Sequence, residues 1–504
     1  MPELDLGAVR LDTGCFLLRP GHGETFRAGA DAAGAGYQHR FSYARSQTGI
    51  ADTAVDLVRG ARHKVFLASF RIGDGPLLEA LYEAVDRLRG GVYVITSWNE
   101  KSLRRGLGEL DDDDLTKDDV KAQNKRFDDM TRRGIAVRGH PECHAKFLVV
   151  DDRVALVTSA NLETSALRDR TSRSVTVESG ALVTDGAETQ RLARFFTRLW
   201  FAGCTGEARP GDGYVLRDRT PEASPCAAPP AATGPEPSVI WTHHDERGIL
   251  DAIVDIAGRA RHELLLASFS LVGLSERANP LLPAIEDACR RGVRVRLLVR
   301  GRNQPGHLRD AAALAALGVE LYPDSLTHAK GAVADAAHGA LFSANFDLDH
   351  GLVNGVEAGI RLDGTPALGE ARRFLLHVMR HSDLRYVQSP AHTDLDQAFP
   401  ARWRRRWPYA SRLRVRADDE HWQQLTAAAL RPPVLYESGG EDKVTLYAGG
   451  QEWTLRRESA HWRLSAVPAA TEQGWKLVRS WTERRGERAG IPARGFAAAV
   501  LMRS

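Results

Sequence analysis

The stretch from residue 144 to residue 161, HAKFLVVDDRVALVTSAN, decides the fold of this chain because its pattern occurs a second time. Residues 328 to 345 read HAKGAVADAAHGALFSAN, with His-Ala-Lys, Asp and Ser-Ala-Asn at identical spacing. In both copies two short apolar runs flank the aspartate, which is typical of two buried strands joined by a turn. Because so specific a pattern recurs, we expect two copies of one structural unit.

The repeat extends well beyond these motifs. ARHKVFLASF, residues 61–70, recurs as ARHELLLASF, residues 260–269. A helical pattern with apolar residues at i, i+4, i+7 and i+8 precedes each, from Ile50 and from Ile249. Each copy continues with a helix from Pro76 or Pro280, a β-branched strand over 92–96 or 293–299, and a further strand after Gly134 or Gly318. We predict strands over 147–150 and 154–158 and over 331–334 and 340–343, followed by a closing helix around 194–196 and 373–375. Helices that alternate with strands in this way predict an α/β sandwich with buried sheets.

Four segments follow from this organisation: a first half over 1–204 with an N-terminal extension, a Pro/Ala/Gly-rich linker over 205–237, a second half over 238–385 and a C-terminal module over 386–504. His63 precedes the first motif by 81 residues, whereas His262 precedes the second by 66. The excess falls around the acidic run 111–114 and extends to Lys125, where we expect a mobile surface loop at the rim of the site. A solvated acidic loop without a function is the alternative.

Composition narrows the class of protein. The chain has 504 residues and 43% hydrophobic content, enough for several buried cores. No apolar run approaches the roughly 18 residues that a membrane span needs, and the N-terminal stretch carries acids where a secretory signal would be basic, so we expect a cytoplasmic protein. The five cysteines contain no C-x-x-C pair and are interpreted as reduced thiols.

Positive charge and aromatic residues are concentrated at the C-terminal end. From residue 401 onward the chain contains 19 Lys and Arg but only 11 Asp and Glu, although the net charge of the whole chain is only +3. The same segment holds seven of the ten tryptophans and predicts a small β-rich module with strands near 444–447, 452–456 and 461–464. Cations alternate with rings at Arg402, Trp403, Arg404, Arg405, Arg406 and Trp407. This pattern suits a nucleic-acid strand, with guanidinium on phosphate and ring on base. An anionic membrane surface, or a tryptophan core with a solvated basic face, remains an alternative interpretation.

The motifs supply the groups that phosphodiester chemistry requires. Two lysines neutralise the phosphate charge, two asparagine amides donate hydrogen bonds to the same oxygens, and two histidines act as nucleophile and as acid/base. A single motif could be a histidine and a lysine on a surface strand, but two copies at equal spacing disfavour that interpretation. No carboxylate cluster suggests a divalent cation, so we expect neither a metal nor another cofactor.

The chain resembles the phospholipase D superfamily, whose signature is H-x-K-x4-D followed by a turn of the G-S-x-N type. The resemblance covers roughly residues 45–385 and includes the duplicated architecture. It implies an α-β-α sandwich in which the two copies pack about a pseudo-two-fold axis, so that one active site is complete within one chain. It also implies a covalent phosphohistidine intermediate and an acid downstream of each motif that orients the opposite histidine. The catalytic residues implied are His144, Lys146, Asn161, Glu178, His328, Lys330, Asn345 and Glu357, with His144 as the nucleophile.

Four further motif residues are expected to support the loops rather than to touch substrate: Asp151, Ser159, Asp335 and Ser343. The chain departs from the family pattern where a glycine usually precedes the serine, because Thr158 and Phe342 stand there. We expect Phe342 to narrow the second half of the cleft. Cys143 lies next to His144 but lacks a partner pattern for a nucleophilic cysteine, so a structural thiol is the favoured interpretation.

The superfamily includes lipid hydrolases, phospholipid synthases and nucleases, and the motifs do not separate them. The basic aromatic C-terminal segment and the expected absence of a secretion signal and of a membrane anchor favour nucleic acid as the partner and nuclease activity as the function. Hydrolysis or transphosphatidylation of phospholipids is the alternative. A binding module without activity is disfavoured because a scaffold would need neither motif.

Overall fold

The computed structural model describes most of the chain up to residue 391 and mainly short strands beyond it. The described residues are 3–5, 8, 10, 14–19, 24–29, 36–43, 49–73, 75–97, 117–162, 175–211, 217–227, 229–230, 232, 234–302, 305–348, 350–391, 394, 414–416, 423–424, 427, 435–438, 443–448, 451–458, 461–464 and 469–470. The chain divides into two compact units. The repeat unit comprises Gly23–Arg300 and Leu326–His381, and the tail unit comprises Met1–His22, Gly301–Ser325 and Ser382–Ser504.

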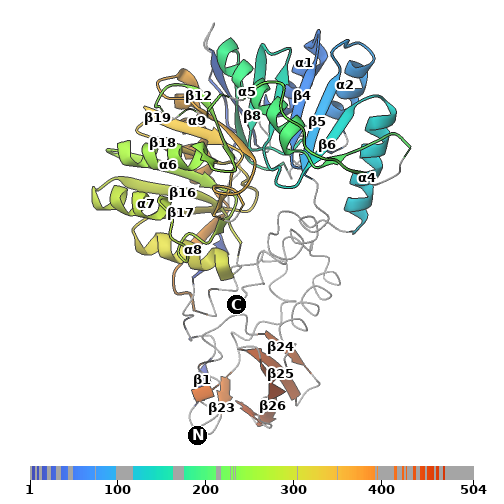
Figure 1. Ribbon diagram of the computed structural model, residues 1–504. Coiled ribbons are helices and arrows are strands. Elements are labelled where there is room, and N and C mark those ends of the chain that lie inside the picture. Colours follow the sequence, from blue (N-terminus) through green and yellow to red (C-terminus); the bar gives the residue numbers. More distant parts are fainter. Residues whose placement is uncertain are drawn as a thin grey trace. The chain divides into compact units, whose positions relative to one another are not determined.

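The first copy of the repeat forms a mixed sheet in the order β11-β10-β6-β5-β4-β7-β8-β9-β3, of which Figure 1 labels the strands β4, β5, β6 and β8. Its strands are β3 (Tyr37–Ser42), β4 (Val65–Ser69), β5 (Val92–Ser97), β6 (Ala136–His140), β7 (Phe147–Val150), β8 (Val154–Thr158), β9 (Glu178–Val183), β10 (Gly206–Glu207) and β11 (Arg217–Asp218). Strands β4, β5 and β6 pair in parallel. The pairs β4–β7, β7–β8, β8–β9 and β9–β3 are antiparallel. The motif strands β7 and β8 therefore lie in the middle of the sheet.

The second copy repeats this strand order. Its sheet runs β13-β12-β21-β19-β18-β14-β16, which matches the order β3-β9-β8-β7-β4-β5 of the first copy apart from the short edge strand β13. The strands are β12 (Ser238–His243), β13 (Glu246–Arg247), β14 (Glu263–Ser268), β16 (Arg294–Arg300), β18 (Gly331–Ala334), β19 (His338–Phe342) and β21 (Glu357–Arg361). A small parallel pair, β15 (Leu271–Val272) with β20 (Phe346–Asp347), accompanies it. The predicted two-copy architecture is confirmed.

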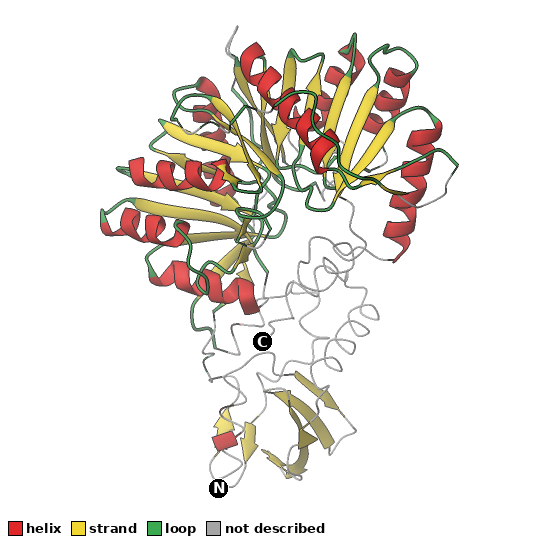
Figure 2. Cartoon of the chain, in the orientation of Figure 1, coloured by secondary structure: helices red, strands yellow, loops and turns green. Residues whose placement is uncertain are grey.

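Helices cover the sheets, as Figure 2 shows. They are α1 (Gly49–Gly60), α2 (Pro76–Val85), α4 (Lys117–Arg132), α5 (Gly186–Arg198) with its π-helical continuation η1 (Leu199–Gly203), α6 (Gly248–Arg259), α7 (Leu281–Arg290) and α9 (Pro366–Arg380). In β4 the side chains alternate between two cores. Val65 and Leu67 pack in one hydrophobic cluster with Ile50 of α1, whereas Phe66 stacks on Phe196 of α5 with ring centroids 4.5 Å apart. Helices on both faces of a buried sheet make the α-β-α sandwich.

The two copies are joined because the closing helix of each packs on a strand of the other as well as on its own sheet. Helix α5 of the first copy packs on β12 of the second, where Phe195 stacks on Trp241 at 4.7 Å between centroids. Helix α9 of the second copy packs on β3 of the first, where Phe374 contacts Phe41 at 5.0 Å. All four of these rings are buried. Because each interface buries stacked or packed aromatic rings, we infer that the copies form one core and would not separate easily.

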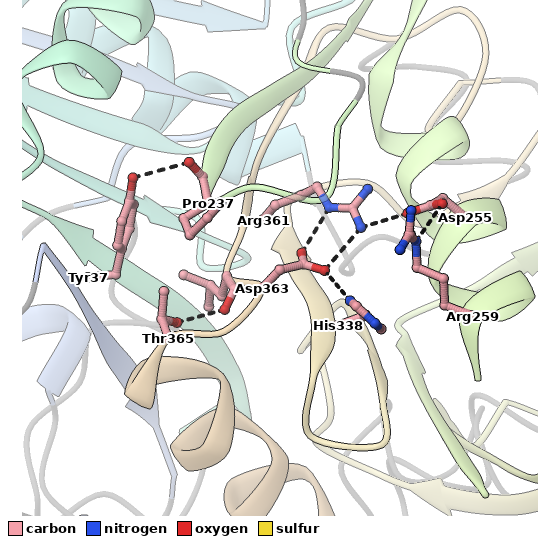
Figure 3. A network of polar contacts seen from close by, with 9 residues as sticks. Tyr37, Pro237, Asp255, Arg259, His338, Arg361, Asp363 and Thr365 are labelled. Atoms are coloured by element: carbon pink, nitrogen blue, oxygen red, sulfur yellow. Dashed lines mark hydrogen bonds and ion pairs between the residues drawn. The ribbon is translucent and has the colours of Figure 1, made fainter. Parts of the chain in front are cut away.

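A buried ionic network stabilises the second copy on the side shown in Figure 3. The Arg361 guanidinium of β21, only 1% exposed, donates from Nε to Asp363 at 2.9 Å and from Nη2 to Asp255 of α6 at 2.7 Å. His338 of β19 is hydrogen-bonded to Asp363 at 2.7 Å. Two carboxylates thus compensate one buried cation, as such a charge requires.

The tail unit contains the predicted β-rich module. Its larger sheet runs β1-β23-β27-β26-β25-β24, with β28 against β26, and β2 pairs with β22. The elements are β1 (Glu3–Asp5), β2 (Cys15–Leu18), α8 (Pro305–Ala316), β17 (Glu320–Asp324), β22 (Leu384–Val387), β23 (Arg414–Arg416), β24 (Leu435–Ser438), β25 (Lys443–Ala448), β26 (Gln451–Glu458), β27 (His461–Leu464) and β28 (Ala469–Ala470). Trp453 of β26 is fully buried, so this tryptophan is a core residue. Residues 402–407, which carry the predicted nucleic-acid contacts, lie outside the described residues.

The structure also differs from two sequence-based expectations. The segment expected to be a loop up to Lys125 is helical from Lys117 onward in α4, while residues 98–116 lie outside the described part. The predicted linker contributes β10 and β11 to the edge of the first sheet, because β10 pairs with β6. The four predicted segment boundaries stay a prediction. Among the described residues no helix combines the length and hydrophobicity that crossing a membrane requires.

Candidate active site

The two His-x-Lys motifs occupy equivalent places, immediately before the strands β7 and β18. In each motif the lysine ammonium donates back to the carbonyl oxygen of its own histidine, over 2.6 Å for Lys146 and 2.9 Å for Lys330. Both lysines have no exposed surface, and His328 is 4% exposed. Buried ammonium groups interact strongly with an anion because water does not screen them.

Each histidine is hydrogen-bonded to a glutamate of the other copy. His144 Nδ1 lies 2.6 Å from Glu357 Oε1. His328 Nδ1 lies 2.9 Å and 3.0 Å from the two carboxylate oxygens of Glu178. The glutamates are the first residues of β9 and β21, which are equivalent strands. The structure thus brings together the predicted pairs and makes them reciprocal between the copies.

Backbone hydrogen bonds hold these cross-copy pairs in register. His144 N donates to Val356 O over 2.9 Å, and Val356 N donates to Glu142 O over 2.9 Å. The equivalent bonds in the other direction run from His328 N to Val177 O over 2.8 Å and from Val177 N to Leu326 O over 2.9 Å. Each motif loop therefore forms a short parallel bridge with the residue that precedes the opposite glutamate. The geometry is that of a pseudo-two-fold axis.

The glutamates are ionised although they are buried. Burial acts to raise the pKa of Glu178, but the charges of His328 and Lys330 and the hydrogen bonds outweigh it, and the pKa is lowered. The same balance, with His144 and Lys146, lowers the pKa of Glu357. An ionised carboxylate only accepts hydrogen bonds, so Nδ1 of each histidine must carry a proton. In the neutral imidazole this leaves Nε2 with a lone pair for reaction.

The motif serines hold the same glutamates from within their own copy. Ser159 Oγ donates to Glu178 Oε2 over 2.6 Å, and Ser343 Oγ donates to Glu357 Oε2. Each hydroxyl in turn accepts a backbone N–H of the neighbouring strand over 3.0 Å. The serines thus hold the glutamate carboxylates in position, and these carboxylates in turn orient the histidine rings.

The motif aspartates directly follow β7 and β18. Each accepts backbone hydrogen bonds from the residues that lead into the neighbouring strand of its own copy, β4 or β14. Asp151 accepts the backbone N–H groups of residues 62–64 over 2.7–2.9 Å. Asp335 accepts those of residues 261–263 over 2.6–2.9 Å. Both aspartates have a positive φ, 54° and 53°, which such bonds help to hold. This accounts for the co-occurrence of the Ala-Arg-His segments and the motif aspartates in both copies.

The asparagines lie three residues after the second motif strand of each copy, β8 or β19. Asn161 and Asn345 are 3% and 6% exposed. Within the described part of the chain, the Oδ1 atom of each has no hydrogen-bond partner. A buried amide oxygen without a partner costs free energy, so its presence in both copies needs an explanation.

Two glycines explain how the motif turns tolerate Thr158 and Phe342. Gly180 lies opposite Thr158 in the pairing of β8 with β9, and Gly359 lies opposite Phe342 in the pairing of β19 with β21. A Cβ at Gly180 would lie 2.9 Å from Thr158 Cβ, and one at Gly359 would lie 2.8 Å from Phe342 Cβ. Phe342 is completely buried, so the expected narrowing of a cleft by its ring is not seen.

Cys143 has the character of a structural thiol. Its side chain is 1% exposed. Burial raises the pKa of this thiol to about 12, although Lys146 acts in the opposite direction. A thiol with so high a pKa stays protonated at neutral pH and is a poor nucleophile.

Sequence reasoning missed three kinds of residue close to the motifs. Phe70 and Phe269 pack against the two histidines, and Ser69 and Ser268 contact the asparagine turns. Asp347, 2% exposed, follows Asn345 by two residues. Burial raises the pKa of Asp347, with His144 and Glu357 both near enough to influence it. The repeated Ala-Ser-Phe sequence was a signal for the first two kinds, whereas Asp347 had none. Among the described residues no cluster of three or more His, Cys, Asp or Glu side chains could hold a metal ion.

Two α/β copies whose closing helices also pack on each other's sheets, and whose motif histidines are each paired to a carboxylate of the other copy, define a phospholipase D-like protein. The family model described as the cardiolipin synthase, PLD-like domain matches residues 55–200 and 253–377. These ranges make up more than half of the chain, which therefore belongs to this family within the phospholipase D superfamily, a superfamily of phosphodiester-processing enzymes. No curated protein shows significant sequence similarity to the chain.

Comparison with solved structures finds partial similarity to several of them. The chain is similar to phosphatidylserine synthase of Haemophilus influenzae Rd KW20, with 12% identity, a TM-score of 0.49 and coverage of 73% of this chain and 91% of that one. It is similar to polyphosphate kinase of Porphyromonas gingivalis, with 13% identity, a TM-score of 0.45 and coverage of 71% of this chain. It spans only 49% of that kinase. The phospholipase D family member Nuc of Salmonella typhimurium shows 22% identity and a TM-score of 0.26, with 30% of this chain and 99% of Nuc covered.

Proposed function

We propose that the chain is a phosphodiesterase that works through a phosphohistidine intermediate and cleaves nucleic-acid phosphodiester bonds. The observation that carries the proposal is the reciprocal pairing of His144 with Glu357 and of His328 with Glu178. Two histidines with the same protonated nitrogen, each held by a buried carboxylate, are suited to divide one reaction into attack and protonation. A fixed ring orientation and a fixed tautomer favour both roles.

The proposed reaction has two displacements at phosphorus. In the first, His144 Nε2 forms a bond to phosphorus while the P–O bond to the leaving group breaks, and His328, which enters the reaction as the imidazolium, gives its Nε2 proton to the departing oxygen. In the second, His328 takes a proton from water, the water oxygen bonds to phosphorus and the P–N bond breaks. Each displacement returns the proton that the other uses, so the enzyme ends in its starting state. We assign the nucleophile to His144 because the family order implies it.

Lys146, Lys330, Asn161 and Asn345 are proposed to bind the non-bridging oxygens of the phosphate. Charge on these oxygens increases as the new bond forms, and preorganised donors in a buried site stabilise that charge better than water does. Glu178 and Glu357 stabilise each imidazolium when it forms and keep the ring oriented. The motif residues Asp151, Ser159, Asp335 and Ser343 act on the loops and not on substrate.

Nucleic acid is the proposed substrate because the positive charge of the chain is concentrated with tryptophans in its C-terminal segment. A polyanion is attracted to such a segment, and exposed rings can stack on bases. Phospholipid is the second candidate, which the description of the matching family as a cardiolipin synthase, PLD-like domain favours. In that case the intermediate would be transferred to water or to an alcohol.

The deciding experiment is a parallel assay of the purified protein in EDTA on single-stranded DNA, duplex DNA, RNA and phosphatidylcholine vesicles. We expect cleavage of at least one nucleic acid at a rate unchanged by EDTA, because lysines rather than a metal neutralise the phosphate. The matched control is the double variant His144→Ala/His328→Ala, which should show no cleavage.

Each outcome of this assay has a definite meaning. Release of choline or phosphatidic acid from vesicles without nucleic-acid cleavage would replace the nuclease proposal with the lipid one. Loss of activity in EDTA and recovery with Mg²⁺ or Mn²⁺ would overturn the metal-independent mechanism itself.

A further prediction concerns the C-terminal segment. Replacing Arg402, Arg404, Arg405 and Arg406 by Gln in the full chain should weaken binding to single-stranded DNA. The slope of log Kd against log salt should become shallower by nearly one unit for each lost phosphate contact. Fluorescence anisotropy of a labelled oligonucleotide over a salt series measures both quantities. Arg290→Gln, an exposed arginine on α7, is the control and should change neither. Unchanged affinity in the fourfold variant would assign the segment a structural role.

A further inference from the structure

The two Ala-Ser-Phe segments, residues 68–70 and 267–269, end equivalent strands, and the proposed reaction assigns them no role. They come from β4 and β14, at the center of the two sheets and next to the motif strands β7 and β18. Because both segments make the same contacts in independent copies, those contacts are a property of the repeat and not of one loop.

The serine of each segment holds the turn that carries the catalytic asparagine. Ser69 Oγ accepts the backbone N–H of Leu162 over 3.1 Å and donates to the carbonyl of Arg71. Ser268 Oγ accepts the N–H of Phe346 over 2.9 Å and donates to the carbonyl of Ser270 over 2.7 Å. Leu162 and Phe346 directly follow Asn161 and Asn345.

These serines have no exposed surface, so their hydroxyls are not available to substrate. Each hydroxyl makes one bond as donor and one as acceptor, which leaves little freedom for it to rotate. The bond to the residue after the asparagine limits how far the asparagine backbone can shift. A shift of about 1 Å in a catalytic group can cost roughly 100-fold in rate.

The phenylalanine of each segment packs against the catalytic histidine of its own copy. The Phe70 and His144 rings have centroids 5.1 Å apart and planes inclined by 62°. The Phe269 and His328 rings are 4.8 Å apart and inclined by 74°. Inclined ring pairs at this distance are favourable and directional.

The same phenylalanine rings also face the motif lysines. Lys146 Nζ lies 5.9 Å from the Phe70 centroid, and Lys330 Nζ lies 5.4 Å from the Phe269 centroid. Both distances are within the range in which an ammonium group is attracted to a ring face. One ring in each copy therefore contacts both members of the His-x-Lys pair.

We propose that Ser69–Phe70 and Ser268–Phe269 are positioning residues that hold the histidine, lysine and asparagine of their own copy, while the opposite copy supplies the glutamate. Each imidazole is thereby fixed at two points. The Glu–Nδ1 hydrogen bond sets the tautomer, and the phenylalanine sets the rotation of the ring, so that Nε2 keeps one direction. This inference rests on the proposed phosphohistidine reaction, because only that reaction requires a fixed direction of Nε2.

The test compares Phe70→Leu and Phe269→Leu with Phe66→Leu in the full chain, on bis(p-nitrophenyl) phosphate and on an oligonucleotide that the wild type cleaves. Phe66 is the matched control because it lies in the same strand β4 but stacks on Phe196 of α5. On the oligonucleotide, the two site variants should lose about 10- to 100-fold in kcat with KM within about twofold, because orientation and not binding is lost. Phe66→Leu should lower the melting temperature without this loss in kcat.

The two site variants should also differ from each other in a way that a structural role cannot imitate. With His144 as nucleophile, Phe70→Leu slows phosphoenzyme formation for both substrates. Phe269→Leu impairs protonation of the leaving group, so it should slow that step for the oligonucleotide but little for p-nitrophenolate, which leaves without a proton. Rapid-quench measurement of phosphoenzyme formation separates the two. Ser69→Ala should reproduce the loss in kcat, and Ser69→Thr, which keeps the hydroxyl, should restore most of it.

The outcomes separate this inference from the proposed function. If the wild type cleaves no phosphodiester, the proposed function fails before any variant is compared. If the wild type is active and Phe70→Leu and Phe269→Leu behave like Phe66→Leu, with stability reduced and kcat unchanged, the positioning role is overturned and the phosphohistidine mechanism stands.

Discussion

His144→Ala or His328→Ala, made singly, should each lower turnover on the natural substrate by roughly 10⁴-fold or more, because residues that act as one catalytic unit lose nearly the full effect when either is removed. The control is His338→Ala. His338 is hydrogen-bonded to Asp363 in the network of Figure 3, takes no part in the proposed reaction, and should leave kcat within a few-fold of the wild type. Steady-state kinetics on the substrate found in the parallel assay measures the effect.

The two single variants should fail at different steps. His328→Ala should still form a phosphoenzyme with a p-nitrophenyl ester, because His144 remains as nucleophile and the leaving group needs no proton. Phosphate retained on His144 after an alkaline quench and peptide mapping would identify the intermediate. Phosphate on His328 would reverse the assignment of roles. Near-normal activity in either single variant would mean that the two copies do not share one site.

Glu357→Gln should lower the rate of phosphoenzyme formation by roughly 10³- to 10⁴-fold, the size of effect seen when a histidine loses the carboxylate that sets its tautomer. Glu357 is fully buried, is bonded to His144 at 2.6 Å, and has a lowered pKa, so the wild-type side chain is ionised at neutral pH. The amide is nearly isosteric but carries no charge to stabilise the imidazolium. Glu263→Gln removes a carboxylate from a structural cluster with Arg296 and Arg372, and it should affect stability more than rate.

The cross-copy pairing makes a sharper prediction in double variants. In the His328→Ala background, measured on a p-nitrophenyl ester, adding Glu178→Gln should change little because its partner is already absent. Adding Glu357→Gln should cause a large further loss because His144 still depends on it. Residues that form one functional pair are non-additive in this way. The opposite ranking of the two double variants would mean that each glutamate serves the histidine of its own copy.

Much of this protein was predictable from local patterns. The helical periodicity predicted the presence of α1 and α6, and the strand patterns predicted β5, β7 and β18 close to their observed bounds, because a buried face requires apolar residues at a fixed spacing. The duplicated spacing predicted two copies, and the strand order is the same in both. The loop that was expected to extend to Lys125 is in part helix α4. This helix contains few apolar residues, so a search for periodic apolar positions does not detect it.

By itself, the sequence determined that the chain has two equivalent α/β units and that each contains a histidine, a lysine and an asparagine in one short segment. These are local properties because the residues concerned are neighbours along the chain. The bond of His144 to Glu357 across 213 positions was expected from the family resemblance alone. Only the tertiary structure decided that Ser69 holds the turn after Asn161, across 93 positions to Leu162. It also decided that Phe342 fits because Gly359 faces it. Spacing along the chain carries no information about such pairs, because strand order and packing bring them together only after the sheets have formed.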